Sequence, residues 1–125
     1  EPAAFEPIPK APAYIPLKYI SDPHQRIEAY RKLAETSDRV GLEALRKEWR
    51  DRFGKLPAPM ELLLQVTEIK LLAAERNVTM VETKEDKLML TRNGDYIQVG
   101  GKFPRLAKRE AKARLAEIRK LLSAI

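Results

Sequence analysis

Two acidic residues near the end of a predicted helix are the side chains best placed to do chemistry, and that chemistry is recognition. Glu48 and Asp51 are three residues apart, so on a helix they share a face and could together accept an arginine from another domain. Asp51 falls in the last turn, where the helix dipole disfavours a carboxylate by a few tenths of a kcal/mol to about 1 kcal/mol. Ion pairs of Asp51 with Lys47 and of Glu48 with Arg52 would contribute roughly 0.3–0.5 kcal/mol each. The residues are therefore either a docking surface or a solvated helix face.

No arrangement of side chains predicts catalysis. The single histidine, His24, lies in a predicted first helical turn, where an exposed or capping residue is expected. The run Gly100-Gly101-Lys102 lacks the first glycine and the final serine or threonine of a phosphate-binding loop. With no cysteine, a metal would need oxygen ligands, and no loop has calcium-binding spacing. We therefore expect neither an enzyme nor a bound cofactor or metal.

Basic residues concentrate near the C-terminus. Between Lys102 and Lys120 the basic residues outnumber the acidic ones by six, which equals the net charge of +6 of the whole chain. A helix predicted from Pro104 to the end would gather five cations on its outer side: Arg105, Lys108, Arg109, Lys112 and Arg119. This side could neutralise phosphates, so a nucleic-acid-binding module is the alternative function. No aromatic residue lies among these cations, so base stacking is not available to them.

The N-terminal part of the chain is rich in proline. Five of the nine prolines lie in the first sixteen residues, which predicts an extended tether over residues 1–12 and one domain over residues 13–125. Ala13 to Ile20 alternates enough for a short strand, which Pro16 confines to a sheet edge or makes irregular. No apolar run approaches the roughly 20 residues of a membrane span. Without cysteine, signal peptide or initial methionine, the chain is expected to be a cytoplasmic piece of a longer protein.

Three helices are predicted before the sheet. The first follows Asp22 as N-cap, and the second follows a break at residues 36–38 and ends at Gly54. The third begins near Pro57 or Pro59 and is apolar almost all round, so it should be the central buried helix. Four residues of the first helix are expected to face the core: Ile27, Tyr30, Leu33 and Ala34.

Three short β-rich runs follow the helices. They span Val78–Thr83, Lys87–Thr91 and Tyr96–Val99, and Asn93-Gly94 between the last two is a strong hairpin signal. The predicted fold class is therefore α+β: a small antiparallel meander, with an additional N-terminal edge strand, packed against a layer of helices and followed by a long basic C-terminal helix.

Several segments resemble one protein family. They are Ala13-Tyr14-Ile15-Pro16, Tyr19-Ile20-Ser21-Asp22, Tyr30-Arg31-Lys32-Leu33-Ala34, the block from Glu48 to Pro57, and the helix from Leu62 to Ala73. The Glu48 to Pro57 block has a distinctive pattern: a Glu, two spacer residues, Asp-Arg-Phe-Gly and then a Pro. This pattern resembles a motif in the C-terminal domain of bacterial transcription-repair coupling factors, the Mfd family. The resemblance covers about residues 13 to 91 and is weaker after Gly94.

The resemblance implies a regulatory domain at the end of an ATP-driven DNA translocase that removes stalled RNA polymerase and recruits UvrA. In the family this domain docks on the UvrB-like N-terminal region of the same protein, masks the UvrA surface and restrains translocation. Glu48 and Asp51 match the acidic positions of that contact, and Arg52 would assist them or fix the helix geometry. The implied direct partner is intramolecular, whereas UvrA, RNA polymerase and double-stranded DNA are reached through the parent protein. We expect no membrane partner and a monomeric isolated chain.

Overall fold

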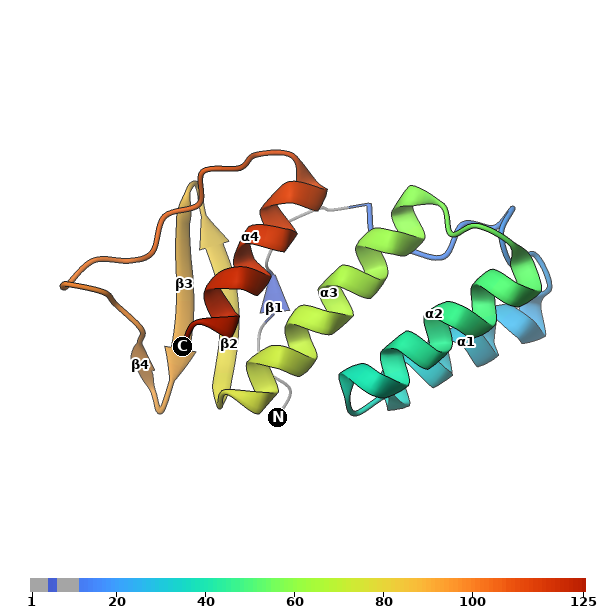
Figure 1. Cartoon of the computed structure of the whole chain (residues 1–125), viewed down its shortest axis with the longest axis horizontal. Coiled ribbons are helices and arrows are strands. Elements are labelled where there is room, and N and C mark those ends of the chain that lie inside the picture. Colours follow the sequence, from blue (N-terminus) through green and yellow to red (C-terminus); the bar gives the residue numbers. More distant parts are fainter. Residues whose placement is uncertain (1–4, 7–11) are drawn as a thin grey trace. The chain divides into compact units, whose positions relative to one another are not determined.

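The computed structural model describes Phe5–Glu6 and residues 12–125 (Figure 1). The elements are β1 (Phe5–Glu6), α1 (Pro23–Glu35), α2 (Arg39–Phe53), α3 (Ala58–Glu75), β2 (Val78–Lys84), β3 (Lys87–Arg92), β4 (Asp95–Tyr96) and α4 (Ala111–Ser123). They make two compact units, which we call the helical unit (residues 12–68) and the sheet unit (β1 with residues 69–125). Helix α3 runs through the boundary between them. The fold class is α+β, as predicted.

Capping side chains define the helices of the helical unit. Asp22 caps α1 by accepting a hydrogen bond from the backbone N–H of Gln25 at 3.0 Å. Asp38 caps α2 in the same way, 2.7 Å from the N–H of Gly41. Gly54 ends α2 with a φ of 91°. The predicted starts of α1 and α2 and the end of α2 are therefore confirmed.

The core of the helical unit lies around one tryptophan. Trp49 is 1% exposed, and ten other apolar residues of this unit are buried: Ile15, Ile20, Ala29, Leu33, Leu42, Leu45, Leu56, Met60, Leu62 and Leu64. The buried face of α1 passes through Ala29 and Leu33, so the prediction was right for Leu33 and wrong for Ile27, Tyr30 and Ala34. Ile27 is 69% exposed. Tyr30 is partly exposed, and its hydroxyl accepts a hydrogen bond from the N–H of Ile15 at 2.9 Å.

The segment before α1 is a turn between the buried Ile15 and Ile20, so the strand predicted from Ala13 to Ile20 was wrong. The carbonyl of Pro16 accepts hydrogen bonds from the N–H groups of Tyr19 (3.0 Å) and Ile20 (3.3 Å), which closes the turn locally. The additional edge strand is β1, within the stretch predicted as a tether. The rest of that stretch up to residue 11 lies outside the described residues.

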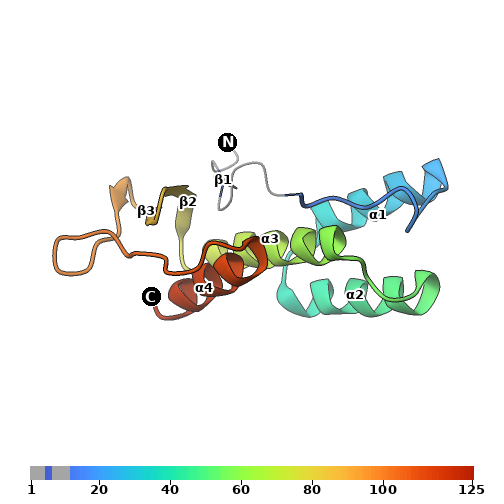
Figure 2. The same ribbon diagram turned by 90° about the horizontal axis from the view of Figure 1, so that it is seen from above.

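The sheet unit contains a four-stranded sheet in the order β1-β2-β3-β4. β1 runs parallel to β2, and the other neighbours are antiparallel, with Val81 opposite Leu90. Asn93 and Gly94 turn the chain with φ values of 54° and 82°, which confirms the predicted hairpin. Helix α4 lies over one face of the sheet (Figures 1 and 2) and buries Leu115, Ile118 and Leu122. The third predicted strand is shorter than expected and ends at Tyr96.

Helix α4 begins at Ala111 with Glu110 as its N-cap, so the prediction of a helix from Pro104 was wrong. Residues 104–108 are held by long-range hydrogen bonds that a helix there would break. The carbonyl of Pro104 accepts from the N–H of Leu88 at 2.9 Å, and the N–H of Leu106 donates to the carbonyl of Asp86 at 2.7 Å. None of the helices in the described part of the chain has the length and apolar character needed to span a membrane.

Candidate functional site

The last two turns of α2 present the predicted site residues on the outside of the helical unit. Burial of Trp49 fixes the rotation of α2, so Glu48, Asp51 and Arg52 are turned away from the core. The Tyr19 hydroxyl secures this end of the helix, because its one proton is shared between the carbonyls of Gly54 at 2.7 Å and Trp49 at 3.1 Å. Burial, together with the negative charge of Glu61, raises the pKa of Tyr19, which keeps the phenol a donor.

Glu48 is held by two cations from different elements. Its Oε2 atom accepts hydrogen bonds from Lys32 of α1 at 3.1 Å and from Arg52 at 3.2 Å. The hydrogen bond from Lys32 is the main reason that the pKa of Glu48 lies below its ordinary value, with Arg52 contributing less. Both contacts use Oε2, so Oε1 has no hydrogen-bond partner within the described residues. The carboxylate is therefore ionised and held in place through Oε2, and Oε1 can accept a hydrogen bond from a partner.

Asp51 is exposed and makes no side-chain hydrogen bond or ion pair with any residue that the structure describes. The ion pair with Lys47 considered as its structural explanation is therefore not formed, whereas the Glu48–Arg52 pair is. Asp51 remains in the last turn of α2, where the helix dipole opposes it and no hydrogen bond or ion pair with a described residue offsets that cost.

Arg52 is occupied within the helical unit. Besides its bond to Glu48, its guanidinium carbon lies 4.9 Å from the centre of the Phe53 ring. Phe53 in turn lies against Tyr19, with ring centres 5.8 Å apart. This arrangement makes Arg52 a support for Glu48.

A hollow of about 280 Å³ between α1 and α2 adjoins these residues. Its lining includes Lys32, Glu48, Trp49, Arg52 and His24. The contribution of α1 was missed by sequence reasoning, because a contact between residues sixteen positions apart on two helices follows from helix packing and not from local spacing. The sequence did offer one indication that Lys32 matters: it lies in the Tyr30 to Ala34 segment, which is among the segments that carry the family resemblance.

The five cations considered for nucleic-acid contact do not share one helix. Lys112 and Arg119 lie on α4, whereas Arg105, Lys108 and Arg109 precede it. Arg105 bonds to Asp86 at 2.5 Å. Among the described residues, no group of three or more His, Cys, Asp or Glu side chains could hold a metal ion.

Comparisons with known protein families give one consistent result. The model of the TRCF domain family matches residues 10–98. The transcription-repair-coupling factor of Haemophilus influenzae is 36% identical over 73 residues, which are 58% of this chain and 6% of that protein. The transcription-repair-coupling factor of Bacillus subtilis is 34% identical over 79 residues, which are 63% of this chain and 7% of that protein. The chain thus spans a small part of the length of these relatives.

A solved structure agrees with the sequence relatives. The crystal structure of the C-terminal domain of transcription-repair coupling factor superimposes with a TM-score of 0.64 at 35% identity. The match covers 69% of this chain and 53% of that chain.

Proposed function

The chain belongs to the TRCF domain family, and on that premise we propose that it is the regulatory, autoinhibitory interaction domain of a transcription-repair coupling factor. It docks on the UvrB-like N-terminal region of the same protein, masks the surface that UvrA uses and restrains translocation on DNA. The parent protein is an ATP-dependent DNA translocase that acts on stalled RNA polymerase. The chain itself supplies binding and no catalysis.

The observation that carries this proposal is the unpaired carboxylate of Asp51 beside the half-free carboxylate of Glu48. An acid that opposes the helix dipole and has no local partner contributes little to folding, so its presence is better explained by a cation from outside the chain. An arginine of the partner domain could bridge Asp51 and Glu48 Oε1 through its planar guanidinium. Lys32 and Arg52 would keep Glu48 ionised and in place for that contact.

Tethering makes a contact of modest strength sufficient. Two domains of one protein meet at an effective concentration that can reach the millimolar range, so a weak interface keeps the closed state dominant. Opening then requires a partner that binds the open state better, here RNA polymerase together with DNA.

The test is Glu48→Ala combined with Asp51→Ala. In the isolated chain the unfolding free energy should fall by about 0–1 kcal/mol, because both acids are at the surface. In the parent protein the same change removes one side of a desolvated charge pair, which typically costs 2–5 kcal/mol and should raise UvrA binding and polymerase-independent translocation together.

The control is Glu35→Ala with Glu43→Ala, which removes two exposed helical acids from other parts of the helical unit. This variant should leave both activities of the parent at the wild-type level. If the Glu48 and Asp51 variant behaves like the control, the two acids are a solvated helix face and the autoinhibitory contact lies elsewhere.

Nucleic-acid contact through the basic C-terminal helix has less support. Three of the five cations lie outside α4, and the charge of Arg105 is paired with Asp86. We expect any affinity of this chain for duplex DNA to be weak and largely lost at physiological salt.

A further inference from the structure

Basic residues outnumber acidic ones at the end of α2 that carries the docking acids. Five basic residues of the helical unit either contact Glu48 or lie within four residues of Asp51 along the chain: Lys32, Lys47, Arg50, Arg52 and Lys55. A partner surface that presented only arginines to the two acids would therefore meet more positive than negative charge. Like charges brought together in an interface oppose association, so a purely basic partner does not fit.

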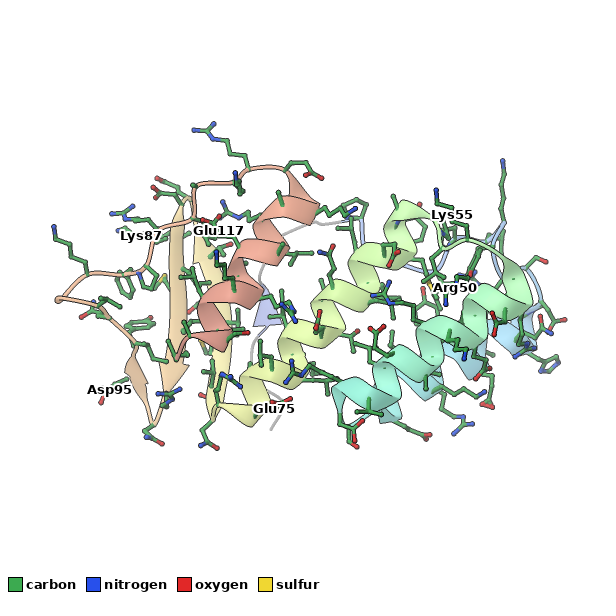
Figure 3. The ribbon with its side chains drawn as sticks, in the orientation of Figure 1. Arg50, Lys55, Glu75, Lys87, Asp95 and Glu117 are labelled. Atoms are coloured by element: carbon green, nitrogen blue, oxygen red, sulfur yellow. The ribbon has the colours of Figure 1, made fainter. Side chains whose placement is uncertain are left out.

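Two of these cations are already occupied and three are not. Lys32 and Arg52 each form an ion pair with Glu48 Oε2. Lys47, Arg50 and Lys55 are exposed, and their side chains make no ion pair with any residue in the described part of the chain. Figure 3 labels Arg50 near the end of α2 and Lys55 in the connection that follows it.

The free cations and the free acid share one side of α2. Lys47 lies three residues before Arg50 and four before Asp51, so it neighbours both on the surface of the helix, while Arg50 and Glu48 flank Asp51 on opposite sides. Lys55 follows directly after the end of the helix at Gly54. Cations at a helix C-terminus are favoured by the dipole, which explains why they are tolerated there but leaves their charge available to a partner.

We infer that the partner surface carries acidic residues that meet Arg50 and Lys55 beside the arginine that meets Asp51 and Glu48. This inference rests on the proposed docking and adds the chemistry of the surface that is docked against. Opposite charges arranged in alternation on both sides fix the register of the interface and reject partners that carry charge of one sign only. Arg50 and Lys55 are specificity-determining residues in this arrangement.

The experiment titrates the full 125-residue chain with the N-terminal region of its own parent protein, using the unsubstituted chain and charge variants. Arg50→Glu with Lys55→Glu should weaken binding at least tenfold, and Arg50→Gln with Lys55→Gln should weaken it by an intermediate factor. The control is Lys70→Glu with Lys120→Glu, which changes the net charge equally but lies on other helices, and it should change binding less than twofold. Circular dichroism of each variant verifies that it is folded.

The outcomes separate this inference from the function on which it rests. If the unsubstituted chain binds and the Arg50 and Lys55 reversal binds equally well or more tightly, the partner surface is basic only and the inference is overturned, while the docking function stands. If the reversal weakens binding no more than the control does, general electrostatic attraction explains the effect, and the inference is again overturned. If the unsubstituted chain does not bind at all, the docking function itself falls, and the inference falls with it.

Discussion

Glu48 shows how one side chain can serve both the fold and a partner. Lys32 and Arg52 hold it through Oε2, so the carboxylate joins α1 to α2, and Oε1 has no hydrogen-bond partner among the described residues. The lowered pKa of Glu48 means that its contribution to stability is present above its unfolded pKa and is lost as the pH falls through the lower folded value. The contribution is small because the side chain is partly exposed to solvent.

Replacing Lys32 should show which cation controls Glu48. Lys32→Met removes the main cause of the lowered pKa and keeps much of the aliphatic stem, so the pKa of Glu48 should rise toward its ordinary value. The measurement is an NMR pH titration of the Glu48 side chain. Arg31→Met is the matched control, because Arg31 pairs with Glu28 and Glu35 and not with Glu48. An unchanged Glu48 titration in the Lys32 variant would mean that Arg52 alone sets the pKa.

Local spacing predicted part of this site. The Glu48–Arg52 pair follows from a separation of four residues on one helix and was predicted correctly. The same rule suggested a Lys47–Asp51 pair that the described residues do not form; there the cation precedes the acid, which is the less favourable order on a helix, whereas Glu48 precedes Arg52. Lys32 could not be predicted, since its contact depends on how two helices pack.

At the scale of elements, the end of α2 depends on a glycine in a conformation that other residues avoid. Gly54 has φ 91° and ψ −170°, a region that is essentially restricted to glycine. A Cβ atom there would meet no heavy atom within 4 Å, so a substitution would be penalised by the backbone alone.

Gly54→Ala should therefore destabilise the chain by about 1–3 kcal/mol. The measurement is urea unfolding followed by the fluorescence of Trp49, which is the single tryptophan of the chain. Lys55→Ala, next to it and exposed, serves as the control and should change stability by less than about 0.5 kcal/mol. A Gly54→Ala variant as stable as the control would show that the helix end can relax to another conformation.

The segment before α4 depends on a carboxylate from the helix itself. Both oxygens of Glu117 lie 3.0 Å from the N–H of Ala107, and Oε1 also accepts from the N–H of Lys108 at 3.0 Å. These backbone donors are the main reason that the pKa of Glu117 is lowered. Its contribution to stability is therefore present above its unfolded pKa and is lost as the pH falls through its folded value.

Glu117→Gln should reduce stability by about 1 kcal/mol once solvent screening is allowed for. It should also speed amide hydrogen exchange at Ala107 and Lys108, as measured by NMR at neutral pH. Asp95→Asn, an exposed acid of the same unit, is the control and should leave both quantities unchanged. The stability difference between the Glu117 variant and wild type should shrink in acid; a difference independent of pH would rule out a role for the ionised carboxylate.

Elements whose ends depend on local signals were predicted well, and the one that depends on long-range hydrogen bonds was not. The ends of α1 and α2 depend on local capping, and the turn at Asn93 and Gly94 depends on residue type, so all of them were predicted. The start of α4 was predicted too early because Pro104 and Leu106 bond to β3 and to the turn before it, far away in sequence. The segment before α1 was misread as a strand for the opposite reason, since Pro16 closes a local turn.

At the scale of the whole molecule, α3 is the element that both units share. Its first part, residues 58–68, supplies Met60, Leu62 and Leu64 to the core of the helical unit, and its last part supplies Ile69 and Leu72 to the sheet unit. A helix of only about 11 residues is marginal in water, because nucleating it is costly. We therefore expect that neither part of α3 stays helical when the other part loses its packing.

If the two parts of α3 unfold together, a cavity made in the core of one unit should also destabilise the other unit. Leu72 is fully buried in the sheet unit, and Leu72→Ala should cost about 2–5 kcal/mol. If α3 unfolds as one helix, the variant should lower the urea midpoint equally by far-ultraviolet circular dichroism, which reports all helices, and by the fluorescence of Trp49, which lies in the helical unit. Leu62→Ala, in the helical unit, should also move both signals together.

A Leu72→Ala variant that keeps the wild-type Trp49 transition while the dichroism shows two steps would mean that the two units unfold separately. In that case the prediction of one domain over residues 13–125 would fail, and the docking surface on α2 would belong to a unit that can remain folded when the sheet unit is lost.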